Sequence, residues 1–96
     1  MSETITLVAK QVRYFSSFDE NAFFYWLNKI EGISWRGMRD ELHIDVPAFE
    51  VPDDVVRELI ALFFRYEIEL KQIRNLINAS NNAWISNPKA YWASRM

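Results

Sequence analysis

The segment ELHIDVP, residues 41–47, places the strongest constraint on the fold of this 96-residue chain. Apolar side chains stand at Leu42, Ile44 and Val46, and polar side chains stand between them. Because successive side chains of a strand point to opposite faces, the alternation predicts a strand over 41–46. One face of that strand belongs to a core, so other elements of the chain must cover it.

Two more strands are expected before this one. Residues 4–12, TITLVAKQV, alternate in the same way and are rich in β-branched side chains. Residues 33–38 can pair with 41–46 as a hairpin whose turn falls at Arg39–Asp40.

Two helices complete the first two-thirds of the chain. Ser17 and Glu20 have the spacing of a capping box, and Gly32 is placed to end the helix that they begin. Asp53 is the expected N-cap of a second helix, which should end near Tyr66. The apolar positions of this second helix recur at helical spacing: Val56, Leu59, Ile60 and Phe63.

Residues 67–77, EIELKQIRNLI, fit two patterns. Ile68 and Leu70 alternate with charged residues as in a strand, whereas Ile73, Leu76 and Ile77 have helical spacing. We predict a strand, since a sheet of three strands would gain a partner. The alternative is one long helix over 54–79.

The remaining residues form a turn cluster at 78–82 and a tail with one or two helical turns, in which Asn87 and Pro88 have N-cap and first-turn chemistry. The whole order predicts one α+β domain over residues 1–96. We expect the ferredoxin-like β-α-β-β-α-β arrangement, an antiparallel sheet with two helices on one face, plus a C-terminal helix.

Composition excludes several chemistries. The chain has no cysteine, so disulfides and thiolate sites are absent, and its two glycines form no phosphate-binding loop. The net charge of −2 argues against a nucleic-acid partner. No segment approaches the roughly 18 apolar residues of a membrane span. We expect a soluble cytoplasmic protein without membrane contact, cofactor or bound metal.

Glu41, His43 and Asp45 share one face of the strand over 41–46 and allow two interpretations. A carboxylate beside an imidazole can orient a general base, and such a set can bind a metal ion. A sheet covered on one side also needs polar residues on its other side. We favour this structural interpretation. The carboxylates of Glu50, Asp53 and Asp54 match no calcium loop, and helix capping explains the two aspartates.

The chain is rich in aromatic residues, which make up 16% of it. Four stand in a row at 23–26, and a helix cannot bury four consecutive side chains on one face, so Phe24 or Tyr25 must point sideways or outward. Aromatic residues are enriched where proteins bind one another. The candidate interface residues are Phe24, Tyr25, Trp35, Trp84, Tyr91 and Trp92.

No motif supplies a function by resemblance. We expect a small non-enzymatic protein-binding domain, whose partner is another protein or a second copy of itself. It would be either an inhibitor or immunity-type protein or a homodimeric module. The alternative from another class is a regulatory domain that senses a small molecule. An enzyme would have to use Glu41, His43 and Asp45.

Overall fold

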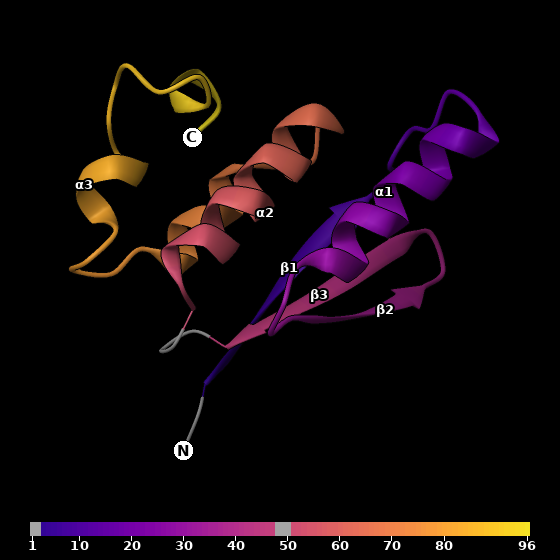
Figure 1. Ribbon diagram of the computed structural model, residues 1–96, viewed down its shortest axis with the longest axis horizontal. Helices are drawn as coiled ribbons and strands as arrows, with labels where there is room; N and C mark the ends of the chain where they lie inside the picture. The colour runs from indigo at the N-terminus through magenta and orange to yellow at the C-terminus, as the bar shows by residue number, and fades with distance from the viewer. Residues whose placement is uncertain (1–2, 48–50) are drawn as a thin grey trace.

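The structure is a computed structural model that describes residues 3–47 and 51–96; Glu50, one of the carboxylates considered above, lies outside these ranges. Two helices pack on one face of a sheet, so the fold has two layers (Figure 1). The C-terminal segment lies beside the second helix. The shortest extent of the molecule, 20 Å, fits these two layers.

The sheet consists of β1 (Thr4–Lys10), β2 (Ser34–Met38) and β3 (Glu41–Pro47). Its order is β1-β3-β2 and both pairs are antiparallel. The hairpin turn at Arg39–Asp40 is confirmed, and Arg39 adopts a left-handed backbone with φ of 58°. Leu7 of β1 lies opposite Ile44 of β3, and both are fully buried beneath the helices.

The two helices also form where they were predicted. The first, α1 (Ser17–Lys29), is capped by Ser16 rather than Ser17, because the Ser16 hydroxyl accepts the amide hydrogen of Asp19. The second, α2 (Asp53–Arg65), buries the predicted stripe together with Val55 and Leu62. The prediction of Asp53 as its N-cap is wrong, because Pro52 occupies that position, Asp53 is the first helical residue and no side chain caps the helix by a hydrogen bond. Because α2 is apolar on two sides, it contacts both the sheet layer and the C-terminal segment.

The predicted fourth strand is wrong, and so is the ferredoxin-like arrangement. Within residues 3–47 and 51–96 the sheet has three strands, although the fold is α+β. Residues after α2 form a 3₁₀ helix, η1 (Lys71–Leu76), instead. The long-helix alternative is also wrong, because α2 stops at Arg65 and Glu67 turns the chain with a φ of 57°.

The physical reason lies in the spacing of the buried residues. Leu70, Ile73 and Leu76 are buried at intervals of three, which is the repeat of a 3₁₀ helix. One side chain of η1 contacts the free edge of β1, where a fourth strand would pair. Gln72 accepts the Val8 amide hydrogen at 2.7 Å and donates to the Val8 carbonyl at 2.9 Å.

The C-terminal segment holds α3 (Asn82–Ile85) and a final 3₁₀ turn, η2 (Ala93–Arg95). Short helical turns were predicted here, but Asn87 and Pro88 begin a turn rather than a helix. Two buried hydrogen bonds fix the segment. Asn81 donates to the Leu76 carbonyl at 3.0 Å, and Trp92 donates to the Ile85 carbonyl at 2.8 Å.

Candidate functional site

The polar row on β3 is the first candidate, and it lies on the sheet face opposite the helices. Cross-strand neighbours on the same face, Thr6 and Arg36, are exposed to solvent. The row is therefore part of an open surface rather than a cleft.

The carboxylates of this row already have partners. Asp45 accepts a hydrogen bond from the Thr6 hydroxyl at 2.6 Å and pairs with Arg36. The Thr6 hydrogen bond and the nearby Arg36 hold the pKa of Asp45 below its usual value. His43 Nε2 lies 3.1 Å from Glu41 Oε2. These contacts join the three strands, which is a structural role.

The same residues were considered for metal binding. In the part of the chain that the structure describes, no group of three or more His, Asp or Glu side chains is arranged to hold a metal ion.

Among the helices of residues 3–47 and 51–96, none has the length and apolar content needed to cross a bilayer.

The six predicted interface aromatics divide into two groups. Phe24, Tyr25 and Trp35 lie on α1 and β2, where Phe24 packs against Trp35 and only Tyr25 points freely outward, 67% exposed. The other three belong to the C-terminal segment. Trp92 is buried, Trp84 is half-buried under Arg57, and Tyr91 is 54% exposed.

The two most exposed apolar side chains lie at the start of α1. Phe15, just before the helix, is 85% exposed and Phe18 is 83% exposed. Phe18, Ala22 and Tyr25 follow intervals of four and three residues within α1, so they share one side of the helix. Phe15 precedes the N-cap Ser16 and lies beside Asp19 and Tyr66 instead. We call Phe18, Ala22 and Tyr25 the α1 outer face. Phe23 and Leu27 on the opposite side are fully packed in the core, so α1 is apolar on two faces.

The backbone that carries this face is fixed at its start. The Asp19 carboxylate accepts the amide hydrogen of Phe15 at 2.9 Å and the hydroxyl hydrogen of Tyr66 at 3.0 Å. Burial, followed by this bond to Asp19, raises the pKa of Tyr66. Phe15 is thus held in position although its ring is in water.

The borders of the face are also ordered. Trp26 donates to Glu58 of α2 at 2.9 Å, and the Lys29 ammonium lies 5.3 Å from the centre of the Tyr25 ring. Between Phe18 and Tyr25 the surface over Ala22 and Trp26 is a shallow, wide-open depression. The face therefore offers projecting rings beside a shallow apolar surface.

The sequence interpretation included Tyr25 but missed Phe15 and Phe18. The signal for Phe18 was present in the spacing of 18, 22 and 25, the interval pattern of a helix–helix seam. It was hidden because Phe23, Leu27 and Ile30 give a complete core stripe on the other side.

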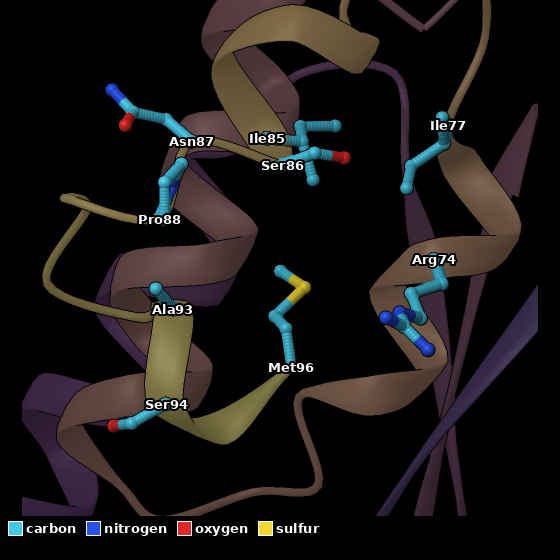
Figure 2. Close-up of a pocket in the computed structure, with 9 residues that line it drawn as sticks. All are labelled: Arg74, Ile77, Ile85, Ser86, Asn87, Pro88, Ala93, Ser94 and Met96. Atoms are coloured by element: carbon cyan, nitrogen blue, oxygen red, sulfur yellow. The ribbon is translucent and has the colours of Figure 1, made fainter.

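A second candidate is a cavity of about 460 Å³ between η1, α3 and the chain's last residues. Figure 2 shows Arg74 and Ile77 on one side, Ile85 above and Met96 projecting into the middle. Ser86 also lines it, and its hydroxyl bonds to Asn82 at 3.0 Å.

Comparison with known proteins gives no functional information. No protein family, no curated protein and no solved structure matches this chain. The function must therefore be argued from the surface itself.

Proposed function

We propose that this protein is a protein-binding module that pairs with a second copy of itself through the α1 outer face. The supporting observation is a pair of aromatic side chains on one side of α1, Phe18 and Tyr25, each at least 67% exposed, with Phe15 85% exposed just before the helix. Exposed aromatic surface of this extent on a small domain usually marks an interaction site.

The spacing of the face favours a second copy as the occupant. If two α1 helices cross in opposite directions with Ala22 at the two-fold axis, the small side chain allows close approach. Phe18 of each copy then meets the shallow depression over Ala22 and Trp26 of the other. This is the self-complementary surface that a two-fold dimer requires.

Charge favours the same orientation. The first turn of α1 is acidic, with Asp19 and Glu20, and its last turn carries Lys29. An antiparallel crossing places Lys29 of one copy beside Phe15 and the acidic turn of the other, where ion pairing and a cation–π contact are favourable. The opposed helix dipoles act in the same direction.

The available area suits a reversible dimer. Aromatic side chains bury about 150–250 Å² each, so the exposed parts of Phe18 and Tyr25 supply roughly 300 Å² per copy. Phe15, Ala22, Trp26 and Lys29 add to this at the borders of the face, so that the total approaches the ~1,000 Å² of the smallest specific interfaces. We expect a dissociation constant in the micromolar range.

The α1 outer face argues against the hypothesis of an inhibitor of a basic toxin. Inhibition of a basic toxin would need an acidic surface, whereas the α1 outer face is apolar and bordered by Lys29.

The cysteine-free sequence supports a cytoplasmic location for the dimer.

Sedimentation equilibrium over a wide concentration range tests the proposal. The wild-type protein should change from monomer to dimer, and Phe18→Glu should remain monomeric because the dimer would bury two unpaired carboxylates. Ser17→Glu is the matched control: it adds the same charge one residue away, outside the face, and should dimerise normally. A wild-type protein that stays monomeric at several hundred micromolar, or equal behaviour of the two variants, would exclude this interface.

A further inference from the structure

We propose that the cavity between η1, α3 and the last residues binds a small molecule that combines a carboxylate with an apolar tail. This site is separate from the α1 outer face, and the inference does not depend on dimerisation.

Arg74 supplies the recognition of the carboxylate. Its side chain turns toward the cavity in Figure 2. The Arg74 side chain is exposed, and none of the ion pairs found among residues 3–47 and 51–96 involves it. The side chains that line the cavity include one cation and no acid. A guanidinium binds a carboxylate through two parallel hydrogen bonds, which makes this charge class the best match.

The walls supply the apolar part of the recognition. Ile77, Ile85, Pro88 and Met96 line the cavity together with Ala93. Its volume of about 460 Å³ lies within the ~300–1,000 Å³ range of small-molecule sites. Met96 is an unbranched, flexible side chain that can move aside as a ligand enters.

Both sides of the cavity are held in place without a ligand. On the η1 side, the Asn81 amide bonds to the Leu76 carbonyl and to the Asn78 amide hydrogen. On the α3 side, the buried Trp92 indole bonds to the Ile85 carbonyl. A site whose walls are already fixed loses less entropy on binding.

Octanoate is the probe for the test, with octanol as its uncharged counterpart. Titration of the wild-type protein, followed by the methyl resonances of Ile77, Ile85 and Met96, should show saturable shifts with octanoate. Octanol should bind at least about tenfold more weakly, since a hydrogen-bonded charge contributes roughly 1.5–3 kcal/mol.

Arg74→Gln should weaken octanoate binding by about tenfold or more for the same reason. Lys71→Gln is the matched control, because it removes a cation from the same 3₁₀ helix outside the cavity, and should bind like wild type. Three outcomes would overturn the proposal: no shifts of these methyl groups at millimolar octanoate, unchanged affinity in Arg74→Gln, or equal affinity for octanol.

Discussion

Asn81 holds together a segment that has neither a sheet nor a long helix. It is the one fully buried polar residue among those described, and its side chain accepts the Asn78 amide hydrogen at 2.8 Å while donating to the Leu76 carbonyl. Since buried backbone groups need hydrogen-bond partners, this amide replaces the pairing that secondary structure would provide.

Asn81→Ala should therefore lower the free energy of unfolding by about 2–3 kcal/mol, because two backbone groups would be left without partners. Urea denaturation measures this change. Asn82→Ala, at the exposed neighbouring position, should stay within about 0.5 kcal/mol of wild type. Equal effects of the two substitutions would contradict the role given to Asn81.

The lowered pKa of Asp45 predicts how the stability of the protein depends on pH. Its pKa is lowered in the folded protein by the Thr6 hydroxyl and by Arg36, so its stabilising contribution is complete above the unfolded pKa of about 3.9 and is lost as the pH falls further. The stability difference between wild type and Asp45→Asn should be largest at neutral pH and shrink below about pH 4.

Chemical denaturation at a series of pH values tests this, with Asp40→Asn as the control, since Asp40 lies in the exposed hairpin turn. The Asp40 variant should follow the wild-type pH profile. A difference in unfolding free energy between wild type and Asp45→Asn that stays constant down to acid pH would contradict the stated role of Asp45.

At the scale of elements, the sequence predicted those helices and strands whose apolar residues recur with a clear period. β3 alternates in one clear pattern and the apolar residues of α2 recur at helical spacing, so these elements were found together with α1, although both predicted N-caps lie one residue too late. Residues 67–77 failed because Ile68 and Leu70 look like a strand when taken alone. The choice depends on the left-handed turn at Glu67 and on the contact of Gln72 with β1, neither of which local spacing reveals.

Gln72 gives the prediction that belongs to this scale. Gln72→Ala removes both hydrogen bonds to Val8 and exposes the edge of β1 to water. The Val8 amide should exchange its hydrogen about tenfold faster or more, as one or two net hydrogen bonds are lost.

The Leu7 amide is an internal control for this measurement, because alternate amides of β1 face β3 and keep their partners. Hydrogen exchange followed residue by residue separates the two positions. If Val8 kept its protection in the variant, Gln72 would not be what closes the edge of the sheet.

At the scale of the whole molecule, the two candidate sites lie in different parts of the fold. The α1 outer face lies on a helix over the sheet, and the Arg74 cavity lies between η1 and the C-terminal segment (Figure 1). The candidate site was only partly predictable. Phe24 or Tyr25 was expected to point sideways or outward, but the sequence could not show that Phe15 and Phe18 stay uncovered, since that depends on where every other element packs.

The central claim is that two α1 helices cross at Ala22, and the absence of native cysteine allows a direct test. Helices in contact at about 8–10 Å bring the Cα atoms at a two-fold crossing to roughly 3.4–5.4 Å, which overlaps the Cα separations of a disulfide. Under mild oxidation Ala22→Cys should form a disulfide-linked dimer in high yield, whereas Ala83→Cys, at an exposed site of α3, should stay largely monomeric. Equal, low yields of cross-linked dimer from both variants would contradict the proposed pairing.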